Sequence, residues 1–443
     1  MNATAQRRVA ITGKGVISPL GSDASTLLDA LRSSQSAVGP ITAIPTEPLP
    51  FSFGAECQQF TGSIDDYGPL DKTVKRGIKK GQNKMCREIA LGVAAAQRAL
   101  SDAGLDADKR DPLRTGVVYG CDYIMTLPEE FSDGIRAVMN ADGQVDFGRW
   151  GSDGLKKVNP LWLLTYLPNM PASHIAIYND LRGPNNSLTL RESSAGAAVA
   201  EAFSTIVRGH ADALVVGSTG CRIHPFRTMH ASMQEDLVGE TGDPATASRP
   251  FDRQRAGAVL GEGAAALILE SEEHALARGA NILGYVSGYG SSCVGPPTTT
   301  DSDRPHHQQM AITHALRAAV GDHPSDIGHI NAHGLSTIQT DAAEAAAIES
   351  VFGSPIQSPP VTTLKGHIGN LGAGGGMVEL VASLQAIGTD DDNSLWPILN
   401  CDALAEDCPI HAVRDNATAA GDSFVTVNVT PQGQATAVKI SRS

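Results

Sequence analysis

Alternating strand-like and helix-like segments are the feature that most constrains the fold of this chain. Short apolar runs predict strands at residues 9–12, 115–119, 187–190, 213–216 and 264–269. Helical patterns lie between them, at residues 84–102 and 195–207. Strands that alternate with helices are typical of layered α/β folds, in which helices cover the faces of a sheet.

A second series of elements follows and repeats the order of the first. The expected strands are residues 282–289, 329–332, 360–364, 424–429 and 436–440, and the expected helices are residues 308–319, 341–351 and 377–387. We therefore expect an α/β fold with two similar βα halves, residues 1–275 and 276–443. Residues 133–157 and 389–394 are interpreted as polar insertions.

The composition argues against several classes of function. Of the 443 residues 41% are hydrophobic, enough for a large core, and the net charge of −14 argues against a nucleic-acid partner. The seven cysteines lack Cys-x-x-Cys spacing and the histidines form no cluster, so the sequence indicates no metal site, disulfide framework or cofactor. Residues 1–8 are polar and no stretch is apolar enough to span a bilayer, so we expect a cytoplasmic protein without a membrane span.

Several short motifs occur in a fixed order along the chain. They are VAITGKGVISPLG at residues 9–21, GPNNSLTLRESSAG at residues 183–196, RPFD at residues 249–252, LGEGAA at residues 260–265 and NAHGLST at residues 331–337. In this order and spacing they resemble the elongating β-ketoacyl-acyl-carrier-protein synthases, over residues 8–440. The resemblance implies a thiolase-like fold with a layered αβαβα core, and acyl transfer in fatty acid or polyketide biosynthesis.

Glu192 occupies the position at which this family has its nucleophilic cysteine. Residues 183–196 are expected to form a strand, a tight turn and an alanine-rich helix. In the family, a thiolate at the start of that helix is stabilised by the helix dipole and accepts an acyl group from a thioester. The resemblance therefore identifies the reactive position, while the carboxylate leaves open whether this chain is an enzyme.

The resemblance assigns three charged or titratable residues to the rest of the site. His333 matches the first histidine of the family, which hydrogen-bonds the thioester carbonyl during decarboxylation. Lys365 matches the lysine of the site. Glu344, eleven residues after His333, matches the glutamate that pairs with this lysine.

The second polar group that faces the thioester has two candidates, His367 and Asn370. If Asn370 is chosen, Lys365 lies five residues before it and Glu379 nine residues after it, and both spacings match the family. We therefore select Asn370 and regard His367 as a bystander. A histidine–asparagine pair resembles that of initiating ketosynthases and chalcone-synthase-type enzymes.

Several roles for Glu192 stay open, and we favour a structural one. A buried ion pair with Lys365 and His333 would lower the pKa of Glu192, keep His333 protonated and remove the nucleophile. The chain would then resemble chain-length factors, the non-condensing partners of ketosynthases, in which glutamine usually replaces the cysteine. The alternatives are a malonyl-carrier-protein decarboxylase, acyl transfer or condensation through Glu192 or Ser193, and a non-catalytic scaffold that binds acyl carrier protein.

Residues 72–87 carry seven basic side chains and no acidic one on a chain that is acidic overall. The resemblance implies that this region docks the acidic acyl carrier protein, and an ordinary solvated helix face is the alternative. The expected docking residues are Lys72, Lys75, Arg76, Lys79 and Lys80.

The resemblance also implies a dimer and a gate residue. Family members pair across a two-fold axis through the strand before the nucleophile, here residues 187–190. We expect a heterodimer with a cysteine-bearing ketosynthase, with a homodimer as the alternative. Val429 matches the phenylalanine that gates the acyl pocket, and Pro431 makes a swinging loop less plausible because its φ is fixed.

Overall fold

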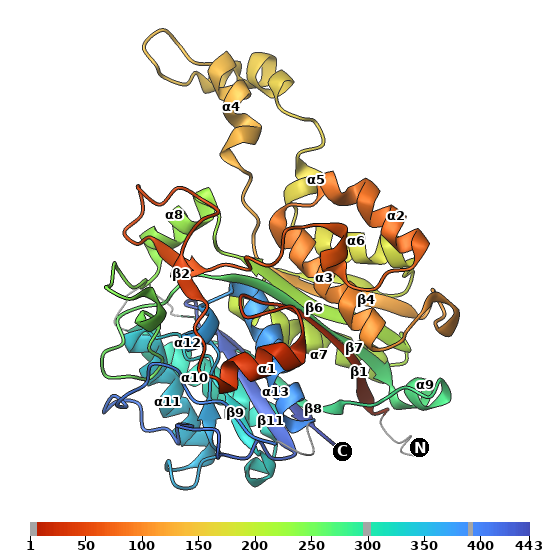
Figure 1. Ribbon diagram of the computed structural model, residues 1–443, viewed down its shortest axis with the longest axis vertical. Coiled ribbons are helices and arrows are strands. Elements are labelled where there is room, and N and C mark those ends of the chain that lie inside the picture. The colour runs from red at the N-terminus through yellow and green to blue at the C-terminus, as the bar shows by residue number, and fades with distance from the viewer. Residues whose placement is uncertain (1–6, 296–302, 389–392) are drawn as a thin grey trace.

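A mixed ten-stranded sheet forms the centre of the molecule and confirms the expected α/β class (Figure 1). The computed structural model describes residues 7–295, 303–388 and 393–443. The strand order along the sheet is β10-β9-β11-β12-β8-β1-β7-β6-β4-β5. The strands of this sheet are β1 (Val9–Ile17), β4 (Thr115–Cys121), β5 (Asn185–Leu188), β6 (Ala213–Cys221), β7 (Glu262–Ser271), β8 (Gly284–Cys293), β9 (His329–Asn331), β10 (Val361–Thr362), β11 (Ser423–Val429) and β12 (Gln434–Ser441). A small separate sheet contains β2 (Val38–Pro40) and β3 (Phe53–Ala55).

The two halves of the sheet repeat one strand pattern. In the first half, β1, β7 and β6 are antiparallel neighbours, and β4 and β5 continue from β6 as parallel strands. In the second half, β8, β12 and β11 are antiparallel, and β9 and β10 continue from β11 in parallel. Only two residue pairs, Ala10 with Tyr285 and Ile11 with Gly284, join β1 to β8. The expected repetition of elements is therefore present in the topology, while the boundary between residues 275 and 276 stays a prediction.

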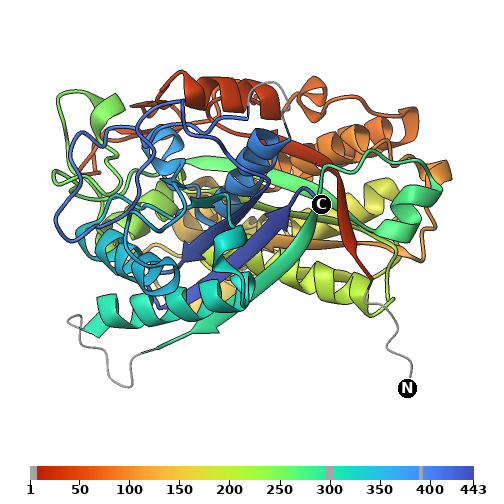
Figure 2. The same cartoon turned by 90° about the horizontal axis from the view of Figure 1, so that it is seen from below.

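Helices cover the sheet in layers, which Figure 2 shows from below. The helices are α1 (Ala24–Arg32), α2 (Lys72–Gly81), α3 (Arg87–Asp102), α4 (Pro128–Ala137), α5 (Leu163–Tyr166), α6 (Met170–Asn179), α7 (Ser194–Val207), α8 (Pro225–Gln234), α9 (Glu272–Ala277), α10 (Arg304–Val320), α11 (Ile338–Phe352), α12 (Lys365–Ile368) and α13 (Gly375–Ile387). Helices α7 and α13 contact strands of both halves, so they lie between the halves. Helix α3 packs on β1, β7 and β6, and α10 packs on the corresponding strands β8, β12 and β11.

Small residues allow the outer helices to lie close to the sheet. A Cβ atom on Gly15 of β1 would lie 2.2 Å from the carbonyl oxygen of Ala95 in α3. In the second half, a Cβ atom on Gly290 of β8 would lie 2.0 Å from the carbonyl oxygen of Ala315 in α10. Glycine is required at both positions because the helix backbone occupies the space of a side chain.

Several boundaries differ from the expected ones for local reasons. The strand expected at residues 187–190 ends at Leu188, because Leu190 and Arg191 turn the chain and Arg191 has a φ of 51°. The helix expected from residue 84 begins at Arg87, because Met85 and Cys86 have extended backbones. These differences change the lengths of the strand and the helix and leave their order along the chain as expected.

The region expected as a polar insertion at residues 133–157 forms most of an arm. The connection from β4 to β5 runs through α4 and a short helical turn, η5 (Trp150–Gly154), which project from the body at the top of Figure 1. This polar insertion also carries apolar side chains at its surface, because Phe147 and Leu155 are exposed there. Of the other expected insertion, residues 389–392 lie outside the described residues.

Within the described ranges, none of the helices has both the length and the apolar character needed to cross a membrane.

The Gly220→Ala variant is expected to lower the free energy of unfolding by about 1–3 kcal/mol. A Cβ atom there would lie 2.0 Å from the carbonyl oxygen of Leu371, in the loop beside the site described below, so β6 or the loop must move. Urea unfolding followed by circular dichroism measures the change. Gly239→Ala is the matched control because nothing lies within 4 Å of its added methyl group, and equal losses in both variants would contradict the packing argument.

Candidate functional site

A strand, a turn and a helix bring residue 192 into the interior, as the motif predicts. After β5 the chain turns at Leu190, whose N–H donates to the hydroxyl of Ser194 over 2.9 Å. Arg191 takes the left-handed backbone region with a φ of 51° and begins the short helical turn η7 (Arg191–Ser193). Glu192 follows it with only 2% of its surface exposed, just before the start of α7.

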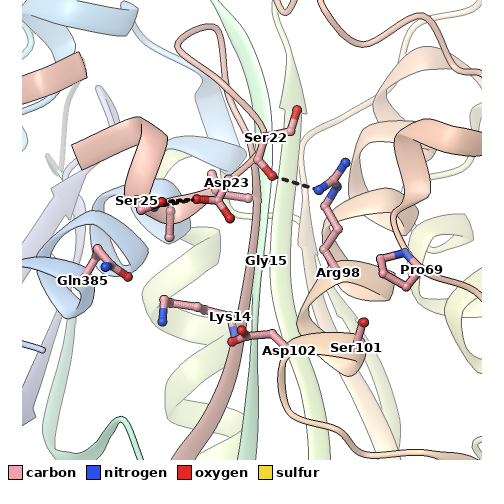
Figure 3. Close-up of a pocket in the computed structure, with 12 residues that line it drawn as sticks. Lys14, Gly15, Ser22, Asp23, Ser25, Pro69, Arg98, Ser101, Asp102 and Gln385 are labelled. Carbon is pink, nitrogen blue, oxygen red and sulfur yellow. Dashed lines mark hydrogen bonds between the residues drawn. The ribbon is translucent and has the colours of Figure 1, made fainter. Parts of the chain in front are cut away.

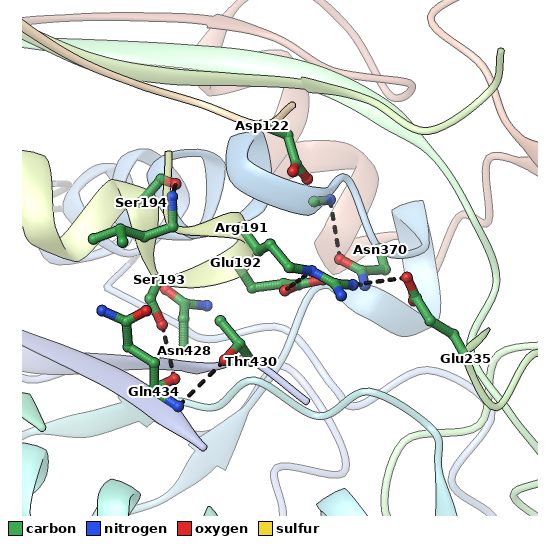
Figure 4. Close-up of polar contacts among 12 residues, drawn as sticks. Asp122, Arg191, Glu192, Ser193, Ser194, Glu235, Asn370, Asn428, Thr430 and Gln434 are labelled. Atoms are coloured by element: carbon green, nitrogen blue, oxygen red, sulfur yellow. Dashed lines mark hydrogen bonds and ion pairs between the residues drawn. The ribbon is translucent and has the colours of Figure 1, made fainter. Parts of the chain in front are cut away.

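Two arginines and an amide surround the Glu192 carboxylate, and Figure 4 shows Arg191 and the amide of Asn370 beside it. Arg222 Nη1 donates to Glu192 Oε1 over 3.4 Å, and Arg191 Nε lies 3.4 Å from Oε2. Asn370 Nδ2 donates to Oε1 over 3.2 Å. The expected partners, Lys365 and His333, do not make this ion pair, so that part of the expectation is wrong.

A second carboxylate balances the two arginines. Glu235, at the end of α8, accepts a hydrogen bond from Arg191 Nη2 over 2.7 Å and another from Arg222 Nη2. Two acids and two guanidinium groups therefore form one cluster of zero net charge, which we call the carboxylate–arginine cluster. Such pairing is what allows charged groups to remain in a protein interior.

The cluster keeps Glu192 ionised. Burial by itself raises the pKa of Glu192, but the positive charges of Arg191 and Arg222 outweigh it and hold the pKa well below its ordinary value. The pKa of Arg191 is raised in turn, because Glu192 and Glu235 outweigh the effect of its burial. The residue at the position expected for the nucleophile is therefore an ionised carboxylate.

Asn370 and His367 occupy different places. The amide of Asn370 has a fixed orientation, because its Oδ1 accepts the N–H of Gly372 over 3.0 Å and its Nδ2 then points at Glu192. His367 is buried elsewhere, with Nδ1 2.8 Å from the carbonyl oxygen of Gln35. Asn370 therefore belongs to the site and His367 is remote from it.

His333 is buried and uncharged. Burial lowers its pKa well below the ordinary value, and the nearby positive charge of Lys365 lowers it further, so the expectation of a protonated His333 is wrong. Asn428 Nδ2 lies 3.5 Å from Nδ1 of His333 and itself donates to Glu379 Oε2. A donor facing Nδ1 puts the ring proton on Nε2, which makes no hydrogen bond.

Lys365 pairs with Glu379 and not with Glu344. Its Nζ donates to Glu379 Oε1 over 2.5 Å, and both side chains are buried. Glu344 instead accepts the backbone N–H groups of His333 and Gly334, over 2.6 and 2.8 Å, and so fixes the loop that carries the histidine. The expected role of Glu344 as the lysine partner is corrected accordingly.

Ser193 and Val429 are both immobilised by the sheet. The Ser193 hydroxyl donates to the carbonyl oxygen of Gln434 over 2.9 Å, away from Glu192. Val429 is the last residue of β11 and pairs with Ala435 of β12. The turn that follows is closed by the bond from the Thr430 N–H to the Gln434 carbonyl, so the backbone of Val429 is held in the sheet, and its role as a gate stays a prediction.

The expected docking residues share one helix. Helix α2 buries Val74 and Ile78, and the opposite surface carries Lys72, Lys75, Arg76, Lys79 and Lys80. We call this surface the basic face of α2. Arg87, from the same basic run, is turned inward and pairs with Glu262 over 2.6 Å.

Sequence reasoning missed a second buried ion group beside the carboxylate–arginine cluster. Arg227 pairs with Asp122 and lies 3.7 Å from Glu88. Burial raises the pKa of Glu88 to about 8. These residues come from α8, the end of β4 and α3, and nothing in their sequence spacing indicates that they meet.

A polar pocket of about 290 Å³ lies away from the site, between α1 and α3 (Figure 3). Several of its polar side chains are held by hydrogen bonds to nearby backbone groups. Asp23 accepts N–H groups at the start of α1, Arg98 donates to the carbonyl oxygen of Ser22, and Asp102 accepts the N–H of Lys14. Among the described residues, no group of three or more histidine, cysteine, aspartate or glutamate side chains could hold a metal ion.

The fold and site define a thiolase-like protein in which an asparagine contacts, and a histidine lies near, a residue at the start of a buried helix. The N-terminal domain of β-ketoacyl synthases matches residues 6–275, and the C-terminal domain matches residues 283–401. The chain therefore belongs to the β-ketoacyl synthase family.

Similar proteins agree with this assignment. The chain is 33% identical to 3-oxoacyl-[acyl-carrier-protein] synthase 2 of Rhizobium meliloti over 399 residues, 89% of each protein. It is 30% identical to the Synechocystis protein of that name over 408 residues, 92% of this chain and 91% of the relative. The structure of a β-ketoacyl synthase from Burkholderia phymatum matches this chain with a TM-score of 0.81 at 26% sequence identity. The structure of the ishigamide ketosynthase/chain length factor matches with a TM-score of 0.79 at 25% identity. Each match covers 99% of this chain and 100% of the other chain.

The stabilising effect of Glu192 is expected to disappear in acid. Its pKa is lower in the folded chain than the ordinary value of 4.5, so its contribution is complete above that value and is lost as pH falls below it. The difference in unfolding free energy between the wild type and Glu192→Gln should therefore shrink between pH 6 and pH 3. Urea unfolding at each pH measures it, with the exposed Glu240→Gln as the control for loss of one carboxylate. A difference that stays constant over this range would contradict the ion-pair assignment.

Proposed function

We propose that this chain is a non-condensing subunit of fatty acid or polyketide biosynthesis, similar in role to a chain-length factor. In this proposal it acts on acyl-carrier-protein thioesters together with a cysteine-bearing ketosynthase. The observation that carries the proposal is Glu192, which lies buried between Arg191 and Arg222 at the turn where the family has its nucleophile.

A carboxylate held in this way is a poor nucleophile. Transfer of an acyl group to Glu192 would remove its negative charge and leave two arginines with one buried partner, Glu235. Breaking a buried ion pair costs about 3–5 kcal/mol. The barrier to acylation rises by a comparable amount, which favours a silent site.

Other side chains offer no replacement for the missing thiol. Burial raises the pKa of Cys57, Cys121 and Cys221, so these thiols stay protonated. In the described part of the chain, none of the seven cysteines makes a hydrogen bond to His333 or Glu192.

Decarboxylation is the second candidate, because the Nε2 of His333 is buried and makes no hydrogen bond. A thioester carbonyl could accept the Nε2 proton, and Asn370 Nδ2 could supply a second donor to the enolate. Glu192 opposes this reaction in two ways: its charge repels a malonyl carboxylate, and it already accepts the Asn370 donor.

Carrier-protein docking on the basic face of α2 completes the proposal. The two relatives named above are synthases of acyl-carrier-protein thioesters by name. Five cations on one exposed surface complement an acidic carrier protein and would accelerate its association.

The edge strand β5 supports a dimer. It ends the ten-stranded sheet, so one side of its backbone pairs with no other strand in the described part of the chain. A cysteine-bearing chain of the same fold that pairs with β5 would provide the nucleophile that this chain lacks.

Purified wild-type protein is expected to form neither an acyl adduct nor a ketoacyl product with malonyl- and acyl-carrier protein, as followed by mass spectrometry. The Rhizobium meliloti relative is the positive control. Glu192→Gln should release carbon dioxide faster than the wild type, by roughly tenfold or more, because the amide removes the opposing charge and adds donors. An acylated wild type that yields product would overturn the proposal, and rapid carbon dioxide release without acylation would select the decarboxylase.

Charge reversal at Lys75, Arg76 and Lys79 to glutamate is expected to weaken carrier-protein binding roughly tenfold at low salt, with a smaller effect at high salt. Surface plasmon resonance at several salt concentrations measures it. The matched control reverses three exposed cations on other surfaces, Lys109, Arg253 and Arg317. If both triple variants bind equally well, α2 is not the docking surface.

A further inference from the structure

Asn428 is a buried amide that lies between Glu379 and His333. It stands one residue before the end of β11 and is 3% exposed. Its Nδ2 donates to Glu379 Oε2 over 2.7 Å and lies 3.5 Å from Nδ1 of His333. One amide group therefore faces both a carboxylate and an imidazole ring.

The orientation of the Asn428 amide follows from its neighbours. Glu379 is paired with Lys365 through Oε1, and an ionised carboxylate only accepts hydrogen bonds, so its Oε2 calls for a donor. The Oδ1 of Asn428 then faces α13, where a Cβ atom on Gly376 would lie 2.3 Å from it. Because Gly376 has no side chain, this oxygen has room and the Nδ2 group stays toward Glu379.

The amide decides which nitrogen of His333 carries the ring proton. Burial and the positive charge of Lys365 lower the pKa of His333, so the ring is neutral, with one donor nitrogen and one acceptor nitrogen. A proton on Nδ1 would face the Nδ2 hydrogens of Asn428, and two donors oppose each other. A proton on Nε2 leaves the lone pair of Nδ1 toward the amide, so this tautomer is favoured.

The Nε2 proton is held at the centre of the site. Glu344 fixes the backbone there, because it accepts the N–H groups of His333 and Gly334. Nε2 is buried and makes no hydrogen bond among the described residues, whereas the Nδ2 donor of Asn370 is already used by Glu192. His333 therefore supplies the donor that remains for a ligand.

We propose that Asn428 is a positioning residue, which holds the ring proton of His333 on Nε2 and so keeps a donor for the carbonyl oxygen of a carrier-bound acyl thioester. The choice of a thioester as the ligand rests on the proposed function. A neutral acyl group suits this site better than a malonyl group, because the ionised Glu192 repels a malonyl carboxylate. The chain thus keeps a hydrogen bond for an acyl group to which it makes no covalent bond.

The first test is ¹⁵N NMR of protein labelled in its histidine rings, because the shifts of the two ring nitrogens report which one carries the proton. We expect the wild type to have the proton of His333 on Nε2, and this measurement needs no variant. In Asn428→Asp an oxygen replaces the Nδ2 group and accepts a proton from Nδ1, so the proton is expected on Nδ1. The spectrum of His333→Gln identifies the signals.

Asn179→Asp is the matched control. Asn179 is also a buried asparagine, 6% exposed, and its Nδ2 donates to the carbonyl oxygen of Ile175 within α6, away from the site. Each variant places an extra carboxyl group in the interior, and each can lose stability. Only Asn428→Asp should move the proton of His333, which a merely structural role would leave in place. Thermal unfolding checks that both variants are folded.

A second measurement connects the donor to its ligand. The probe is carrier protein loaded with a hexanoyl group through a non-hydrolysable amide, and unacylated carrier protein is the reference. The Nε2 signal of His333 should shift only with the acylated form, which the wild type should bind roughly threefold or more tightly than the reference. Asn428→Asp should lose this preference and keep its affinity for unacylated carrier protein.

Contrary outcomes separate the parts of the inference. A proton on Nδ1 in the wild type, or the same His333 signals in the wild type and Asn428→Asp, would overturn the role of Asn428. Equal binding of acylated and unacylated carrier protein would overturn the carbonyl as the ligand. Acylation of Glu192 or a ketoacyl product would instead refute the proposed function and leave the assignment of the ring proton standing.

Discussion

A buried carboxylate requires buried cations, and this requirement organises the centre of the molecule. Glu192 lies at the start of a helix between the two halves of the sheet, where an unpaired charge would be strongly destabilising. Arg222 reaches it from the end of β6, and Arg191 reaches it from the turn itself. Glu235, at the end of α8, pairs with both guanidinium groups and balances the remaining positive charge. Helix α8 is thereby linked to the same cluster. The position that the resemblance assigns to a nucleophile is thereby occupied by a fixed ionic junction.

The surroundings of the junction retain much of the family's polar machinery. His333 is held by its loop through Glu344, Asn370 is oriented by Gly372, and Lys365 is paired with Glu379. These groups lie on the second half of the chain, whereas Glu192 and its arginines lie on the first. The first half places a carboxylate where the resemblance predicts a nucleophile, while the second half carries the histidine, the asparagine and the lysine that the resemblance assigns to the site. Such a division is consistent with a subunit that keeps the shape of the site and leaves the chemistry to a partner.

Much of the fold was predictable because periodicity and close packing act locally. The alternation of elements and the doubled topology follow from short apolar runs and from glycines that admit a helix backbone, such as Gly15 and Gly290. The spacing of the family motif also favoured Asn370 over His367, since only that placement fits both Lys365 and Glu379, and Asn370 does contact Glu192. The apolar surface of the arm was not predicted, because Phe147 and Trp150 stand among polar residues and only the folded backbone brings them to one pocket.

The sequence by itself determined the architecture and the absence of a thiol at residue 192, because both depend on residue type and order along the chain. Tertiary structure alone decided which charges meet. Arg222 and Glu235 lie 30 and 43 residues after Glu192 in the sequence, and the packing of β6 and α8 brings Arg222 into contact with both carboxylates. It also decided that His333 is neutral, because burial removes the water that would stabilise an imidazolium ion, and no sequence pattern reports that loss.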